Sequence, residues 1–173
     1  MGVVLARRLR GELDVVMVRK LRAPGAPEYA VGAVDETGWT YVTPQAAGAG
    51  ATPEYLEEEK RRQLLEMRRR RMLYTPTRAS IPVEGRTAIV VDDGLATGAT
   101  MLAALHAVRE RKPVCLVCAV PVASAESLEL VRPFADEVVC IAAPAGFAAV
   151  GQFYQSFPQV EDAEVVDMLR APP

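Results

Sequence analysis

The second half of the sequence alternates apolar runs of strand length with segments of helical length. The apolar runs are TAIVVD from Thr87, PVCLVCAV from Pro113 and EVVCIA from Glu137. Between them, residues 100–111 and 124–132 predict helices. Strands that are apolar on both faces and alternate with helices are typical of parallel pairing with right-handed crossovers. This half therefore predicts an α/β fold, a mostly parallel sheet flanked by helices on both faces.

The first half has a different pattern. LDVVMV from Leu13 is a continuous apolar run of strand length, and AVGAV from Ala30 with WTYV from Trp39 predicts a hairpin. A loop rich in Gly, Ala and Pro then leads to a charged helix at residues 53–73, with Thr52 as its N-cap. We interpret this part as a small hood with a flexible loop and helix inserted at about residues 43–80.

Composition limits the classes of protein that fit. The 173 residues suit one domain spanning residues 1–173, and 50% hydrophobic with 24% charged residues is typical of a globular chain. Lys and Arg number 20 and Asp and Glu 22, a net charge of −2, which argues against a nucleic-acid partner. Three cysteines and no signal peptide predict a reducing compartment, the cytoplasm. Residues 138–160 are uncharged, but their Pro, Gly and Gln residues argue against a membrane span.

The segment IVVDDGLATGATM, residues 89–101, carries the strongest chemical signal. Asp92 and Asp93 end a buried strand, and a loop of small residues then leads into a helix. In open parallel sheets, ligands bind at this carboxyl edge. Small residues let backbone N–H groups approach an anion, and the helix N-terminus adds positive potential. The loop therefore favours a phosphate group, and the candidate binding residues are Gly94, Leu95, Ala96, Thr97, Gly98, Ala99 and Thr100.

Two adjacent carboxylates beside a phosphate would repel it unless they face vicinal hydroxyls or a divalent cation. A sugar phosphate bound with a metal ion satisfies both conditions. The alternative is a strand-to-helix turn in which the two carboxylates only cap the helix. The segment is neither a Walker loop nor a dinucleotide fingerprint, because it has no Gly-Lys-Ser/Thr and no GxGxxG after a strand.

The run VVDDGLATGAT resembles the phosphoribosyl-pyrophosphate signature of the type I phosphoribosyltransferases. VVMVRKLRAPGAPEYAVGAV, VPVAS and FAAVGQFY are similar to a branch of bacterial phosphoribosyltransferases, so the resemblance covers nearly the whole chain. It implies that Asp92 and Asp93 bind the ribose 2′- and 3′-hydroxyls while residues 94–100 hold the 5′-phosphate. It also implies Mg²⁺, held by Asp92 and Asp93 through the ligand or water.

Arg19 and Lys20 follow the run LDVVMV, so they stand at the same sheet edge as the Asp pair if the strands are parallel. In the family, a basic residue here reaches the pyrophosphate leaving group. The resemblance therefore makes Arg19 and Lys20 candidate catalytic residues beside Asp92 and Asp93. The alternative is a solvated pair of charges at a strand end.

The sequence departs from the family in two places. Relatives open with another strand and a glycine loop that binds pyrophosphate, whereas this sequence begins with Met1 and an apparent helix. On this comparison we expect an N-terminally shortened chain. Ala96 stands where the 6-oxopurine enzymes of the family have an acidic residue, which disfavours hypoxanthine or guanine as the acceptor.

These observations predict an enzyme that transfers the 5-phosphoribosyl group from phosphoribosyl pyrophosphate to a nitrogenous base and releases pyrophosphate. The alternative is a non-catalytic regulatory module that binds phosphoribosyl pyrophosphate or a nucleotide. We expect a homodimer.

Four other features are open to two interpretations each. Cys115 and Cys118 form a CxxC, but on a strand they favour core packing over a redox or zinc pair. His106, the single histidine, favours helix packing over catalysis. The alternating charges of residues 53–73 favour a solvated face over a nucleic-acid patch. The aromatic residues of 147–157 favour a core or dimer contact over stacking on an acceptor base.

Overall fold

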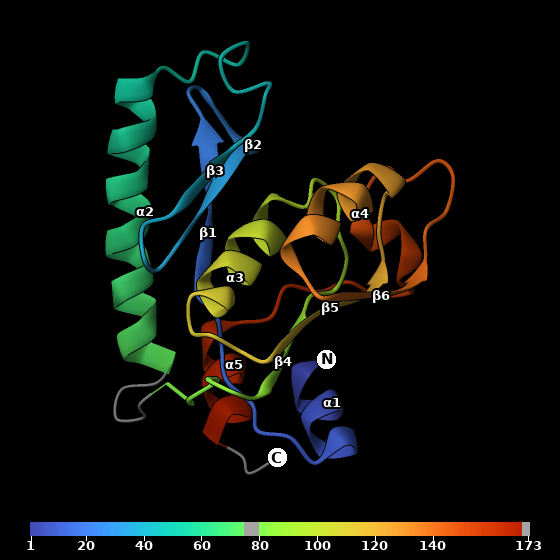
Figure 1. The fold of residues 1–173 in the computed structure, drawn as a ribbon. Helices are drawn as coiled ribbons and strands as arrows, with labels where there is room; N and C mark the ends of the chain where they lie inside the picture. Colours follow the sequence, from blue (N-terminus) through green and yellow to red (C-terminus); the bar gives the residue numbers. More distant parts are fainter. Residues whose placement is uncertain (75–79, 171–173) are drawn as a thin grey trace.

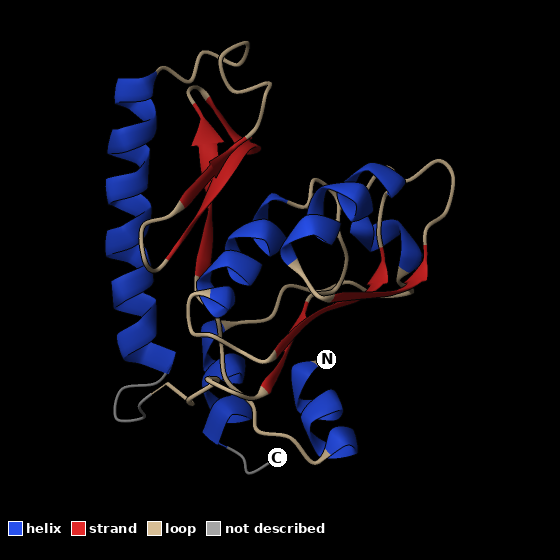
Figure 2. Cartoon of the chain, in the orientation of Figure 1, coloured by secondary structure: helices blue, strands red, loops and turns tan. Residues whose placement is uncertain are grey.

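The computed structural model describes residues 1–74 and 80–170, and its strands form two separate sheets (Figures 1 and 2). One is an antiparallel sheet of three strands in the order β1-β2-β3, and the other is a parallel sheet of three strands in the order β4-β5-β6. The α/β class, the parallel sheet and the hood predicted from the sequence are therefore confirmed.

The parallel sheet is built from the second half of the chain. Its register is continuous, with Val91 opposite Ala119 and Ala119 opposite Val139. Helices α3 and α4 cover one face, where a core forms around Leu102, Leu105 and Leu116, all fully buried. The elements are β4 (Thr87–Val91), α3 (Ala99–Arg109), β5 (Cys115–Val122), α4 (Ala125–Val131), the 3-10 turn η1 (Arg132–Phe134) and β6 (Glu137–Ala142).

The hood is the antiparallel sheet together with the long helix beside it. Helix α2 packs on one face, where Leu21 and Met67 are buried, and α3 packs on the other, where Ala33 meets Ala99 and Ala103. Figure 1 shows this sheet standing between the two helices. The elements are β1 (Val18–Ala23), β2 (Ala26–Asp35), β3 (Thr40–Val42) and α2 (Pro53–Tyr74). The hairpin predicted from Ala30 and Trp39 is confirmed as β2 and β3.

Helix α2 lies in the segment predicted as a flexible insertion. Thr52 caps it as predicted, because the Thr52 hydroxyl accepts a hydrogen bond from the Tyr55 N–H at 3.2 Å. Glu66 forms ion pairs with Arg69 and Arg70 along its surface, which agrees with the solvated-face interpretation. Residues 75–79 of the predicted insertion lie outside the described residues.

The prediction of a strand over the whole run LDVVMV is wrong. Residues 13–17 have no strand conformation, and β1 begins only at Val18 and runs antiparallel to β2. The apolar run lines a groove beside β4 instead. A strand needs a hydrogen-bonded neighbour, and an apolar run of the right length does not supply one.

Three further short elements lie outside the two sheets and the helices named above: α1 (Gly2–Leu9), the 3-10 turn η2 (Val150–Phe153) and α5 (Asp162–Arg170). Helix α5 lies against the end of α2, where the Tyr74 hydroxyl donates to Asp162 at 2.6 Å. None of the helices in the described part of the chain is long and apolar enough to cross a membrane.

Candidate functional site

Asp92 and Asp93 follow β4 directly, at the carboxyl edge of the parallel sheet. The Asp92 N–H donates to the Ala119 carbonyl at 3.3 Å and so extends the pairing with β5 by one residue. The Asp93 N–H then turns back and donates to the Asp92 carboxylate at 2.9 Å. This bond stabilises the turn by which the chain leaves the sheet, and it places both carboxylates at the edge where ligands of such sheets bind.

The two carboxylates are destabilised in their charged forms. Burial raises the pKa of Asp92 to about 6, and the charge of Asp93 adds to the rise, while the Asp93 N–H and Lys20 oppose it. Burial also raises the pKa of Asp93, against the opposing effects of its own N–H and of Lys20. Pairs of acids with raised pKa values in a cleft are typical of functional sites. A cation or a set of hydroxyl donors bound here would stabilise both carboxylates.

The loop that follows is fixed to helix α4 through its carbonyl groups. Leu95 is buried and its N–H donates to the Val122 carbonyl at 3.0 Å. The Leu95 carbonyl accepts from the Ser124 N–H at 3.1 Å and from the Ser127 hydroxyl at 3.0 Å. The Ser124 hydroxyl donates to the Ala96 carbonyl at 3.2 Å. Two consecutive carbonyl groups of the loop therefore face α4.

This anchoring decides where the N–H groups of the loop point. In a planar trans peptide the N–H points away from the carbonyl oxygen, so the N–H groups of Ala96 and Thr97 are directed away from α4. Gly98 then adopts a left-handed conformation, with φ 74°, and α3 begins at Ala99. Ala96 and Thr97 form the exposed tip of the loop, and the helix N-terminus follows at once. The loop thus offers N–H groups and a helix dipole to an anion.

Lys20 and Arg19 lie on opposite faces of the hood sheet, as neighbours in a strand must. Lys20 pairs with Ala33, the residue that meets α3, and its charge acts on both Asp92 and Asp93. Arg19 faces α2, and its Nε donates to Gln63 Oε1 at 3.0 Å. The structure therefore turns Lys20 toward the α3 side of the hood sheet, where its charge influences both carboxylates, and places Arg19 against α2.

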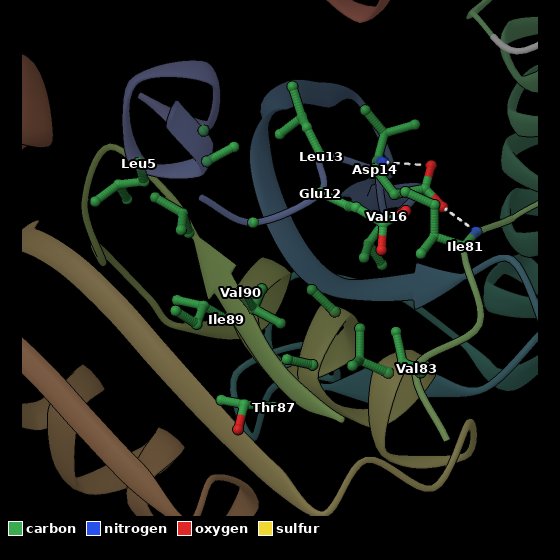
Figure 3. Close-up of a pocket in the computed structure, with 18 of the residues that line it drawn as sticks. Leu5, Glu12, Leu13, Asp14, Val16, Ile81, Val83, Thr87, Ile89 and Val90 are labelled. Atoms are coloured by element: carbon green, nitrogen blue, oxygen red, sulfur yellow. Dashed lines mark hydrogen bonds between the residues drawn. The ribbon is translucent and has the colours of Figure 1, made fainter. Parts of the chain in front are cut away.

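A groove of about 540 Å³ runs along β4 and reaches the candidate site at one end. Figure 3 shows Leu5 of α1 and Val16 on its sides, with Ile89 and Val90 of β4 between them. Asp92 and Thr100 line the same groove. The groove is largely apolar, so we place the polar chemistry at its Asp92 end.

Sequence reasoning missed a contact between the aromatic segment 147–157 and the acidic turn. The Tyr154 hydroxyl donates to the Asp93 carbonyl at 2.6 Å, although the two residues are 61 positions apart. Val150 packs over Gly94, where a Cβ would come within 2.9 Å of both Val150 methyl carbons. The spacing of the aromatic residues carried no signal for this contact.

His106 and Cys118 pack against other parts of the protein. The His106 ring stacks on Trp39 at 4.2 Å, and its Nδ1 lies 2.9 Å from Asp35, so it joins α3 to the hood. Cys118 is buried, and burial raises the pKa of its thiol to about 11, which makes it a poor nucleophile. These placements agree with the packing interpretations of His106 and Cys118, whereas Cys115 is half-buried and belongs to none of the core clusters of the described residues.

The donor set at the acidic turn suits a hard divalent cation. Asp92 and Asp93 offer carboxylate oxygens, the ligand type that Mg²⁺ prefers. Among the described residues there is no group of three or more His, Cys, Asp or Glu side chains that could hold a metal ion. A pair of carboxylates fits an ion that keeps its waters and shares the oxygens of a bound substrate.

A parallel sheet whose carboxyl edge carries two carboxylates, a loop of small residues and a helix N-terminus is the kind of edge at which α/β proteins bind phosphorylated ligands. The family model described as "Phosphoribosyl transferase domain" matches residues 1–154. The chain belongs to this family.

Relatives and a solved structure agree with this assignment. Two Mycobacterium tuberculosis proteins, from strains CDC 1551 and H37Rv, are provisionally named phosphoribosyl transferases and are each 41% identical over 166 residues. The match covers 95% of this chain and only 38% of theirs. The crystal structure of TT1426 from Thermus thermophilus is similar with a TM-score of 0.76 and 47% identity, over 96% of this chain and 79% of that one.

Proposed function

We propose that the chain carries the site at which phosphoribosyl pyrophosphate reacts with a nitrogenous base and releases pyrophosphate. The observation that carries the proposal is the continuous arrangement of the acidic turn, the anchored loop and the start of α3. It offers hydrogen-bond acceptors for two hydroxyls beside N–H donors for one phosphate. A ribose 5-phosphate has these groups at matching ends.

The residues have distinct roles in this proposal. The Asp92 and Asp93 carboxylates accept hydrogen bonds from the ribose 2′- and 3′-hydroxyls, which fixes the sugar ring. The loop of Gly94, Leu95, Ala96, Thr97, Gly98, Ala99 and Thr100 binds the 5′-phosphate through its available N–H and hydroxyl groups, while the Leu95 N–H stays bonded to the Val122 carbonyl and anchors the loop. Binding at both ends orients the anomeric carbon for displacement.

Charge stabilisation comes from a metal ion and from the hood. Mg²⁺ near Asp92 and Asp93 would neutralise the charge that develops on the departing pyrophosphate. Lys20 acts from the hood on the same region, because its charge already influences both carboxylates. Arg19 acts indirectly in this account: its bond to Gln63 holds α2 against β1 and so positions the strand that carries Lys20.

The proposal is tested by measuring pyrophosphate release with Mg²⁺, phosphoribosyl pyrophosphate and a panel of purine and pyrimidine bases. Lys20→Met should lower the rate about tenfold or more, since it removes a charge that stabilises the transition state. Lys60→Met makes the same chemical change on α2 and should leave the rate within about twofold. Equal rates in the wild type and Lys20→Met would contradict the role of Lys20.

The same assay, run beside a calorimetric titration with phosphoribosyl pyrophosphate, separates the enzyme from a binding module. If the wild type binds phosphoribosyl pyrophosphate but releases no pyrophosphate with any base, the chain acts as a sensor of this ligand. If it neither binds nor reacts, the proposed function is wrong.

A further inference from the structure

The segment after β6 returns to the acidic turn and fits against it at two points. The Tyr154 hydroxyl donates to the Asp93 carbonyl at 2.6 Å. The two Val150 methyl carbons lie 2.8 and 2.9 Å from the position that a Cβ of Gly94 would take. One contact is polar and the other is steric, and both involve the residues on either side of the peptide group that joins Asp93 to Gly94.

This peptide group is the first of the candidate phosphate loop. Because the peptide is planar and trans, the Gly94 N–H points away from the Asp93 carbonyl oxygen. Glycine has no Cβ to restrict its backbone, so a contact from outside must hold this peptide in one orientation. The Tyr154 hydroxyl is such a contact.

We propose that Tyr154 is a positioning residue, which fixes the Asp93–Gly94 peptide so that the Gly94 N–H is held in place for the ligand phosphate. The inference rests on the proposed function and assigns to it a residue outside the acidic turn and loop. Tyr154 does not touch the ligand in this account and acts only through the peptide.

Two features of the surroundings support this role. The Tyr154 ring packs on Phe157, with ring centroids 5.2 Å apart, and this contact favours the ring position from which the hydroxyl reaches Asp93. The hydroxyl of a tyrosine carries its proton at neutral pH, so it can donate this hydrogen bond to the Asp93 carbonyl. The hood adds a positive charge to the same region, because Lys20 of β1 acts on both carboxylates.

The test compares two variants that each lose one hydroxyl. Tyr154→Phe removes the bond to Asp93. Tyr55→Phe is the matched control, because the Tyr55 hydroxyl donates to the Arg22 carbonyl at 3.0 Å, in the hood. Titration calorimetry with phosphoribosyl pyrophosphate and Mg²⁺ gives the dissociation constant, and pyrophosphate release gives KM and kcat.

We expect Tyr154→Phe to weaken binding by about fivefold to tenfold, the effect of one net hydrogen bond, and to raise KM by the same factor. kcat at saturation should change by less than about twofold, since the carboxylates and Lys20 are intact. Tyr55→Phe should lower the melting temperature about as much as Tyr154→Phe does, because each variant loses one hydrogen bond, but it should leave the dissociation constant unchanged. A purely structural Tyr154 would behave like Tyr55.

A second readout follows the peptide itself. The amide resonance of Gly94 in an ¹⁵N NMR spectrum should shift in Tyr154→Phe and not in Tyr55→Phe, because the hydrogen bond polarises that peptide. Equal affinity of the wild type and Tyr154→Phe, with an unmoved Gly94 resonance, would overturn the positioning role alone. A wild type that binds no phosphoribosyl pyrophosphate would overturn the proposed function, and with it this inference.

Discussion

The hood and the parallel half of the molecule differ in how completely they are packed. The hood sheet lies between α2 and α3, and Leu21 and Ala33 on its two faces are both 0% exposed. In the described part of the chain, α3 and α4 cover one face of the parallel sheet. On its other face Ile89, Val139 and Ile141 are 42%, 45% and 83% exposed.

The candidate site belongs mainly to the less completely packed half. Asp92, Asp93 and the loop all follow β4, and the hood contributes Lys20. Helix α3 joins the two halves, since His106 contacts both Trp39 and Asp35. The candidate ligand-binding residues therefore lie in the parallel half, and the hood supplies one charged residue and contacts that stabilise the protein.

The largest expected effect tests the packing difference. Leu21→Ala should cost about 3 kcal/mol of unfolding free energy, because it opens a cavity between α2 and the hood sheet. Ile141→Ala should cost less than about 0.5 kcal/mol, since the residue is exposed. Denaturant unfolding measures both values. A large, concentration-dependent cost at Ile141 would instead indicate that a second copy of the chain covers this face.

A smaller effect is expected where the aromatic segment meets the loop. Gly94→Ala should destabilise the protein by about 2 kcal/mol, because its Cβ would overlap Val150 and come within 3.0 Å of the Val122 carbonyl. Gly11→Ala is the control, since a Cβ there meets nothing within 4 Å. Thermal unfolding compares the two. Equal melting temperatures would show that segment 147–157 does not pack on Gly94.

The smallest effect concerns the charge of Asp92. Its pKa is about 6 in the folded protein and about 4 in an unfolded chain, so the folded state binds more protons between these values. Unfolding free energy therefore falls as the pH rises from about 4 to about 6. Asp92→Asn keeps the acceptor for the Asp93 N–H and removes the charge. The unfolding free energy of Asp92→Asn should exceed that of the wild type by about 1 kcal/mol at pH 7.5, a value reduced because Asp92 is partly exposed. Near pH 4 the two unfolding free energies should be equal.

The measurement for this prediction is the melting temperature of both proteins across that pH range. Asp167→Asn, an exposed residue of α5, provides the control and should follow the wild type throughout. A difference between Asp92→Asn and the wild type that persists at pH 4 would contradict an origin in the carboxylate charge.

Much of the fold could be predicted from the sequence, because local patterns determine it. Apolar runs located β4, β5 and β6, and Thr52 located the start of α2. The run from Leu13 failed because pairing depends on a neighbour that the run itself does not encode. The true strand β1 begins where that run ends and extends to Ala23, across charged residues that carry no apolar pattern.

The acidic turn and loop could also be located, because their residues are consecutive. Neighbours such as Arg19 and Lys20 lie on opposite faces of any strand, but the register of β1 against β2 was needed to show that Lys20 takes the α3 face and Arg19 the α2 face. The contact of Tyr154 with Asp93 joins residues far apart in the sequence, so no local pattern could predict it. The anchoring of the Leu95 carbonyl by Ser124 and Ser127 was missed for the same reason.

The most direct test of the central claim is a calorimetric titration of the protein with phosphoribosyl pyrophosphate and Mg²⁺. We predict that the wild type and Asp167→Asn bind with the same dissociation constant, and that the double variant Asp92→Asn with Asp93→Asn, folded as judged by its melting transition, shows no binding. Unchanged affinity in the double variant would contradict the assignment of the acidic turn as the ligand site.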